Sequence, residues 1–143
     1  MTFYGAHNFN LRHWFRQWEL HLESKYEIQI VNPFYDVNRE DVKAVDDGLK
    51  PRYNGDYTIV VQSDLKLVED SHAVIACIDG SFGLGTPMEM FYARHVLSKA
   101  VFAICPPEHI DHPWLRYVTE LGQSYICAED FEEDLDAGII EIA

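Results

Sequence analysis

Glu89 is the residue of this chain whose position best suits it for catalysis. It follows the apolar run Ala73–Ile78 and a turn that carries glycines at positions 80, 83 and 85. The run predicts a strand covered on both faces, as in parallel sheets, where ligands gather at the carboxyl ends of the strands. Because glycines lack a Cβ, this turn can bend sharply and approach a bound molecule. We therefore expect the Glu89 carboxylate to face a ligand.

The same residues also have a purely structural interpretation. Thr86-Pro87-Met88-Glu89 matches a capping box with proline at the first helical position. In a capping box the Thr86 hydroxyl and the Glu89 carboxylate each accept a hydrogen bond from a backbone N–H, and the helix dipole favours an acid in the first turn. Judged alone, this segment favours capping over catalysis by roughly two to one.

Composition bounds the size of the protein and its possible partners. The 143 residues are 48% apolar and 13% aromatic, enough for the core of one domain, and we expect a single domain over residues 1–143. The 24 acidic residues outnumber the 11 Lys and Arg residues, and the net charge of −13 disfavours binding to nucleic acid polymers or anionic membranes. Because the sequence shows no apolar run of about eighteen residues and no basic leader segment, we expect a cytoplasmic protein without a membrane span.

The cysteines and histidines do not predict a disulfide or a metal site. Cys77, Cys105 and Cys127 are odd in number, lie at the ends of apolar runs and show no CxxC spacing, so we expect free thiols in a reducing compartment. Segment 108–112 gathers Glu, His, Asp and His, but its spacing matches no helical pair of metal ligands. We give a metal site there roughly one chance in ten.

Short apolar runs alternate with helical patterns along the chain. Five runs are candidate strands: Thr2–Ala6, Glu27–Val31, Ala73–Ile78, Ala100–Cys105 and Ser124–Cys127. Apolar residues at helical spacing lie between them in four groups: Leu11, Trp14, Phe15, Trp18 and Leu22; Leu65 and Val68, with Ile59 and Val61 as weaker members; Met88, Phe91, Tyr92 and Val96; and Leu115, Val118 and Leu121. Strands that alternate with helices predict a parallel α/β sheet. Segment 32–57 is the one long irregular stretch and is typical of a lid or binding loop.

Three segments, in the same order, resemble the nucleoside 2-deoxyribosyltransferase family. They are Phe3-Tyr4-Gly5-Ala6 on the first strand, Ser63-Asp64-Leu65 at the start of a helix, and the most specific of the three, Gly83 to Ala93. The resemblance extends over about residues 2 to 105, and the family also includes N-glycosidases that hydrolyse nucleosides or nucleoside monophosphates. It implies a flavodoxin-like, doubly wound sheet of five parallel strands with helices on both faces, and a site where the first and third strands part.

The resemblance implies that Glu89 is a nucleophile that attacks the anomeric carbon of a 2′-deoxyribonucleoside. The base leaves and a covalent 2-deoxyribosyl ester forms; a second base then attacks the ester, and two inversions give retention. Such a pentosyltransferase of nucleoside salvage takes deoxynucleosides and free purine or pyrimidine bases, and needs neither a metal nor an organic cofactor. The family's habit of completing sites across subunits implies a homodimer or homohexamer. If water attacks in place of a base, the enzyme is a hydrolase.

Other residues receive roles from the same resemblance. Asp64 matches the second active-site acid, which holds the sugar and the nucleophile in register; by itself it is an ordinary acid near the start of a helix. Gly5 is expected beneath the sugar, and Gly85 in the turn beside it. Asn8 and Phe9 lie in the loop that contacts the base, although an isolated phenylalanine more often packs in a core.

The chain departs from the family pattern at two positions that are expected to contact substrate. Phe3 stands where many relatives have a tyrosine whose hydroxyl orients the nucleophile, and Tyr4 is not expected to replace it, because neighbouring strand residues point to opposite faces. Gly83 stands where relatives commonly have an aspartate that reads the base edge. Asp79, at the end of the third strand, is the nearest candidate to take over that hydrogen bond.

The 5′ end of the substrate and the activity itself leave alternatives. Segment 112–117 has no Asn or Gln to match the amide that a neighbouring subunit contributes in transferases of the family. Arg116 could recognise a 5′-phosphate instead, or lie solvated at the surface. Hydrolysis of a nucleoside or of a nucleoside 5′-monophosphate is the first alternative to base exchange. Because of Phe3 and Gly83, a non-catalytic nucleotide-binding module is the second.

Overall fold

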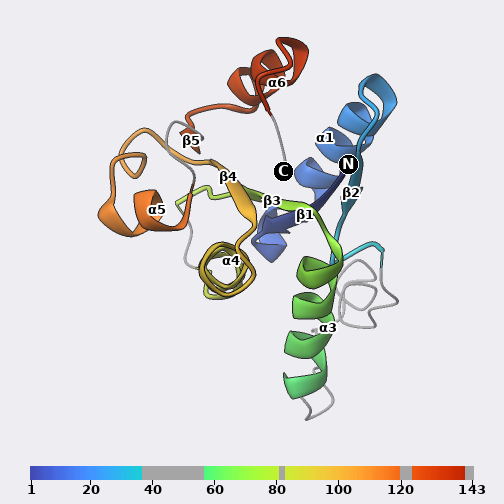
Figure 1. Cartoon of the computed structure of the whole chain (residues 1–143), viewed down its shortest axis with the longest axis vertical. Helices are drawn as coiled ribbons and strands as arrows, with labels where there is room; N and C mark the ends of the chain where they lie inside the picture. The colour runs from blue at the N-terminus through green and yellow to red at the C-terminus, as the bar shows by residue number, and fades with distance from the viewer. Residues whose placement is uncertain (37–56, 81–82, 120–123, 141–143) are drawn as a thin grey trace.

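A parallel sheet of five strands forms the centre of the molecule, in the order β2-β1-β3-β4-β5 (Figure 1). The structure, a computed structural model, describes residues 1–36, 57–80, 83–119 and 124–140. The strands are β1 (Thr2–His7), β2 (Gln29–Val31), β3 (Ala73–Cys77), β4 (Ala100–Ile104) and β5 (Ser124–Tyr125). The expected five-stranded parallel sheet is confirmed, and the strands differ from the predicted runs only at their ends.

Helices connect the strands and cover both faces of the sheet. They are α1 (Arg12–Lys25), preceded by the 3-10 turn η1 (Phe9–Leu11), α3 (Tyr57–Asp70), α4 (Gly85–Phe91), the π-helical turn η2 (Tyr92–Val96) that continues α4, α5 (Pro113–Val118) and α6 (Ala128–Asp136). Within the described ranges, no helix is both long enough and apolar enough to cross a membrane. Residues 37–56, which make up most of the expected binding loop, and Leu121 lie outside the described residues.

The order of the strands determines where a ligand can bind. β1 pairs with β2 on one side and with β3 on the other, and β3 continues the sheet towards β4. The chain therefore leaves the carboxyl ends of β1 and β3 in opposite directions, and in doubly wound sheets ligands bind at such a switch point. Every residue of β3 is buried, as expected for a strand with helices on both of its faces.

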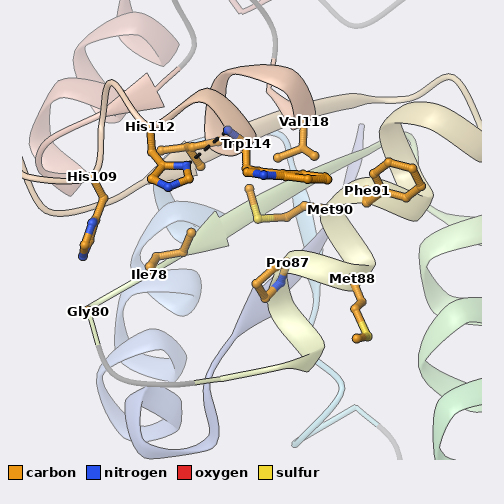
Figure 2. A pocket seen from close by; sticks show the side chains of 11 residues that line it. Ile78, Gly80, Pro87, Met88, Met90, Phe91, His109, His112, Trp114 and Val118 are labelled. Atoms are coloured by element: carbon orange, nitrogen blue, oxygen red, sulfur yellow. Dashed lines mark hydrogen bonds between the residues drawn. The ribbon is translucent and has the colours of Figure 1, made fainter.

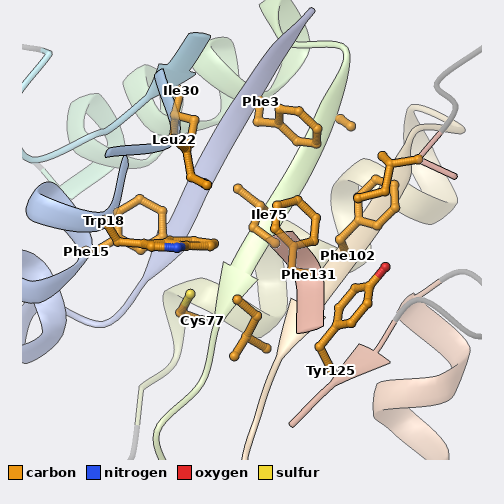
Figure 3. Close-up of a cluster of buried hydrophobic side chains, with 13 residues drawn as sticks. Phe3, Phe15, Trp18, Leu22, Ile30, Ile75, Cys77, Phe102, Tyr125 and Phe131 are labelled. Carbon is orange, nitrogen blue, oxygen red and sulfur yellow. The ribbon is translucent and has the colours of Figure 1, made fainter. Parts of the chain in front are cut away.

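One face of the sheet, which α1 and α6 cover, is packed with aromatic rings (Figure 3). Phe3 lies in this first core, with its ring centroid 6.0 Å from that of Phe102 and 6.3 Å from that of Phe131. Phe15 and Trp18 of α1 belong to the same cluster. The rings meet edge to face, the arrangement that their quadrupoles favour, and this packing fixes α1 and α6 against the sheet.

The opposite face is covered by α3, α4 and α5 and holds smaller side chains. Tyr4 of β1, Val68 of α3, Met90 of α4 and Leu115 of α5 meet in this second core. Alternation along β1 thus sends Phe3 and Tyr4 to opposite faces, as the two-residue period of a strand requires. It is Tyr4, not Phe3, that lies on the side of α4.

Helix α4 begins earlier than the capping interpretation predicts. Its first residue is Gly85 and its N-cap is Leu84, not Thr86, so the predicted capping box is wrong. Thr86 lies inside the helix, where its hydroxyl donates to Oδ1 of Asn8 at 3.4 Å. A partner from a distant part of the chain has replaced the local backbone partner, and Glu89 lies beyond the first turn.

The buried face of α4 also differs from the sequence pattern. Of the apolar residues that predicted this helix, Met88 and Phe91 are 65% and 41% exposed. Thr86, Met90 and Ala93 are buried instead, at the spacing i, i+4, i+7. The face with Thr86, Met90 and Ala93 therefore packs on the sheet, and Met88 and Phe91 remain outside.

Candidate active site

Two loops meet at the carboxyl edge of the sheet. β1 and β3 end side by side, with His7 opposite Cys77, so the residues that follow them lie at the same edge of the sheet. Nδ2 of Asn10, after β1, donates to Oδ2 of Asp79, after β3, at 3.3 Å. This hydrogen bond ties the loops together in front of the two strands, and it gives the predicted base-reading residue Asp79 a partner within the protein.

Glu89 lies in the second turn of α4 and is half-buried. Its Oε2 atom is shielded from solvent, and a Cβ built at Gly85 would lie 3.3 Å from its Oε1 atom. The carboxylate therefore extends back along the helix towards Gly85, the direction in which helical side chains point. Because Gly85 has no side chain, the Glu89 carboxylate can lie against the first turn of α4.

The absence of a side chain at Gly83 is explained by Asn8. A Cβ built at Gly83 would lie 2.6 Å from Cγ of Asn8 and closer still to its Oδ1. The backbone of Gly83 does not need glycine for its conformation, since the positive φ angles among the described glycines occur at Gly80 and Gly138. The amide of Asn8 therefore fills the volume into which a side chain at position 83 would project.

Asp64 lies on the same side of the sheet as Glu89. It was expected at the start of a helix but lies in the middle of α3, because that helix begins at Tyr57. Asp64 is half-buried and lies four residues before the fully buried Val68, so both side chains belong to one face of that helix. α3 leads into the parallel strand β3, and its earlier turns lie nearer the carboxyl edge of the sheet. Asp64, Tyr4 and Glu89 are thus brought to one side of the sheet, and the Tyr4 hydroxyl is buried there.

Phe3 and Gly5 are not brought to that side. Phe3 packs in the first core, and a Cβ at Gly5 would lie 2.5 Å from Cε1 of Phe15 and 3.2 Å from Cγ2 of Ile30. Gly5 therefore has a packing reason of its own, which is to admit the Phe15 ring. Its expected place beneath a sugar stays a prediction.

The architecture is similar to that of solved structures of known 2-deoxyribosyltransferases. A 2-deoxyribosyltransferase from Bacillus psychrosaccharolyticus matches with a TM-score of 0.67 and 17% identity, over 99% of this chain and 97% of that chain. A 2-desoxiribosyltransferase from Leishmania mexicana matches with a TM-score of 0.63 and 12% identity, over 94% of this chain and 97% of that chain. A conserved protein from Enterococcus faecalis V583 matches with a TM-score of 0.68 and 15% identity, over 96% of this chain and 98% of that chain.

The chain has the 2-deoxyribosyltransferase fold. The fold implied by three short sequence segments is therefore confirmed. No family model matches the sequence, and no curated protein does. The similarity lies in the arrangement of the backbone, since few residues are identical to those of the solved structures.

In this 2-deoxyribosyltransferase fold, aromatic rings pack around His7 at the end of β1. No pattern in the sequence predicted this cluster. The His7 ring stacks on Phe15, with centroids 4.0 Å apart, and meets the edge of Phe34 at 5.1 Å. Burial lowers the pKa of His7 to about 4, although a hydrogen bond to the Gly5 carbonyl raises it. Since a carbonyl only accepts, the Nδ1 atom that lies 3.0 Å from that oxygen carries the proton, and the ring is neutral at neutral pH.

Phe9, which was expected to stack on a base, contacts protein groups in this structure. The Arg12 guanidinium lies 3.9 Å from the centroid of its ring, and the Phe34 ring meets it at 5.4 Å. Nη1 of Arg12 also donates to the Phe9 carbonyl at 3.1 Å. Arg12 and Phe34 are thus neighbours of the candidate base-binding loop that only the tertiary structure reveals.

A cavity of about 660 Å³ lies beside α4, between this helix and the segment that leads into α5 (Figure 2). Its lining is mostly apolar and includes Pro87, Met88, Phe91, Trp114 and Val118. Glu89 is not among its lining residues, although Met88 and Met90 on either side of it are.

The segment expected to read the 5′ end has partners within the protein. Arg116 forms an ion pair with Asp111, and Nδ1 of His112 accepts a hydrogen bond from the Trp114 N–H at 3.2 Å, which caps α5. Among the described residues, no group of three or more His, Cys, Asp or Glu side chains could hold a metal ion. Asp111 and His112 of segment 108–112 thus contact the first residues of α5.

Proposed function

We propose that this protein is a nucleoside 2-deoxyribosyltransferase that acts through Glu89. The observation that carries the proposal is the position of Glu89 in the second turn of α4, outside the capping box that the sequence alone favoured. Glu89 there lies close in the chain to the turn that follows β3 at the switch point. The likeness in fold to two deoxyribosyltransferases supports the same proposal.

The proposed reaction uses one carboxylate twice. A Glu89 oxygen forms a bond to the anomeric carbon of a 2′-deoxyribonucleoside while the N-glycosidic bond breaks, and the base leaves with the electron pair and takes up a proton. A ring nitrogen of a second base then attacks the same carbon, loses its own proton, and releases the Glu89 carboxylate. The missing 2′-hydroxyl lowers the cost of positive charge at that carbon, so that a carboxylate suffices as nucleophile.

The other residues position the reactants. Asp64 and Tyr4 lie on the same side of the sheet as Glu89, and we assign to Asp64 the binding of the sugar. We assign to Asn8 contact with the base from the other side of the crevice, where its amide meets Thr86 and Gly83. A group held by two partners loses little entropy when a substrate arrives, which is the purpose of preorganisation.

Incubation with deoxyinosine, with and without free adenine, tests the proposal when the products are separated by chromatography. Base exchange produces deoxyadenosine only when adenine is present. If free deoxyribose forms at the same rate with or without adenine, the enzyme is a hydrolase and not a transferase. If no deoxynucleoside or monophosphate is turned over, both activities are contradicted.

Replacement of Glu89 identifies the nucleophile. We expect Glu89→Gln to lower kcat by at least about 10³-fold, because the amide cannot form the ester. Glu129→Gln, an exposed carboxylate on α6, is the matched control and keeps full activity. In the unmodified protein the intact mass should rise by one 2-deoxyribosyl group when a donor is present without an acceptor.

A further inference from the structure

Position 83 and Asn8 share one volume in the candidate site. The Gly83 backbone could carry a side chain without strain, because its φ angle is not among the positive ones of the described glycines. What prevents a side chain is the Asn8 amide, whose Cγ would lie 2.6 Å and Nδ2 2.9 Å from a Cβ at this position. All three contacts under 3.0 Å are with this one amide, so a side chain at position 83 requires the Asn8 side chain to move away.

The Asn8 amide is held where it is by a second contact. The Thr86 hydroxyl donates to its Oδ1 at 3.4 Å, from within the first turn of α4. Thr86 is 3% exposed, so this hydrogen bond is part of the packed structure rather than of the surface. The amide is therefore fixed between the turn that contains Gly83 and the helix that carries Glu89.

We propose that the Asn8 carboxamide takes the place of a side chain at position 83 and is the group that recognises the edge of the base. This inference rests on the proposed function. It means that an amide, not a carboxylate, hydrogen-bonds to the edge of the base in this protein. A carboxamide both donates and accepts hydrogen bonds, whereas a carboxylate only accepts. The same volume filled by a carboxylate would thus select different bases, with preference for edges that carry an amino group.

An exchange of the two side chains tests the proposal. The variants are Gly83→Asp, Asn8→Ala, and the double variant that carries both changes; Asn8→Ala removes all three clashing atoms and leaves the strand end intact. We expect Gly83→Asp alone to lower the melting temperature by about 5 °C and kcat/KM by about 100-fold. The double variant should regain most of the melting temperature and at least about tenfold in kcat/KM, because the aspartate then fits the vacated volume.

Base preference provides the second measurement. With adenine and cytosine as amino-bearing acceptors and hypoxanthine and uracil as oxo-bearing acceptors, the ratio of amino to oxo use should rise about tenfold or more in the double variant relative to the unmodified protein. Additive effects of the two substitutions, or an unchanged ratio of acceptors, would overturn the proposal. The melting temperatures need no substrate, so the absence of any transfer by the unmodified protein would contradict the proposed function while the shared volume is still measured.

Discussion

At the scale of single residues, two neighbours on β1 pack in opposite cores. Phe3 occupies the family position of a tyrosine, but its ring lies in the first core against Phe102 and Phe131. Tyr4 lies in the second core with Met90 of α4, and its hydroxyl is buried there. The rule that neighbouring strand residues point to opposite faces holds, but it places Tyr4 on the side of the proposed nucleophile.

Replacement of Tyr4 by phenylalanine tests this arrangement. We expect Tyr4→Phe to lower kcat of base exchange by about 10- to 100-fold, because a hydroxyl in a low-dielectric core can orient a nearby carboxylate. Phe3→Tyr should not raise kcat, since its hydroxyl would enter the first core. Kinetics of both variants, with Tyr26→Phe as a surface control whose hydroxyl binds Asp136 at 2.8 Å, provide the measurement. An unchanged kcat in Tyr4→Phe would remove Tyr4 from the site.

At the scale of elements, a buried carboxylate joins α1 to the segment after β2. Glu19 is fully buried; Nη1 of Arg16 donates to its Oε1 at 2.5 Å and Nδ2 of Asn32 to its Oε2 at 3.1 Å. The backbone N–H of Asn32 in turn donates to Asp36. The same segment carries Phe34 against His7, so this network positions one wall of the candidate site.

Two buried groups in these elements titrate in opposite senses. Burial raises the pKa of Glu19 to about 7 despite the hydrogen bonds from Arg16 and Asn32, and burial lowers the pKa of His7 to about 4. As pH rises, the folded protein keeps the Glu19 proton to a higher pH than the unfolded chain does. The stabilisation that protonated Glu19 contributes is therefore lost as pH rises from about 4.5 to 7. The unfolded chain takes up a proton on His7 at a higher pH than the folded protein does. The stabilisation that neutral His7 contributes is therefore lost as pH falls from about 6.5 to 4.

The variant Glu19→Gln separates these two effects. In the unmodified protein they oppose each other between about pH 4.5 and 6.5, each worth up to roughly 3 kcal/mol over its full range. Without the Glu19 titration, the free energy of unfolding should rise clearly from pH 4.5 to 6.5, because only the His7 effect remains. Urea unfolding at both pH values measures the difference, and equal slopes in the two proteins would show that Glu19 is not protonated in the fold.

At the scale of the whole molecule, exposed aromatic side chains of α4, η2 and α5 form an apolar face. Phe91 is 41% exposed, Trp114 69% and Tyr117 58%. His95 stacks on Tyr117 at 4.1 Å and holds η2 to α5. Exposed apolar patches of this kind mark surfaces at which proteins associate. We therefore expect the homodimer or homohexamer implied by the resemblance to bury this apolar face.

A charge placed on this face should prevent assembly. Phe91→Glu is expected to give a monomer in sedimentation velocity, because association would bury an unpaired carboxylate in each copy. Ile139→Glu, at a residue that is 62% exposed beside α6, is the control and should leave the assembly intact. A monomeric unmodified protein, or an unaffected oligomer in Phe91→Glu, would contradict this prediction.

Local patterns in the sequence were sufficient to predict the five strands, their alternation with helices, the opposite facing of Phe3 and Tyr4, and the place of Glu89 after β3. These features depend on the period of burial along a short stretch of chain, which sequence records directly. The start of α4, the partner of Thr86 and the reasons for Gly5 and Gly83 depend on Asn8 and Phe15, which are distant in the chain. Only the folded backbone brings those side chains into contact. The start of α4 and the glycines at positions 5 and 83 therefore depend on neighbours in space, which local sequence patterns do not record.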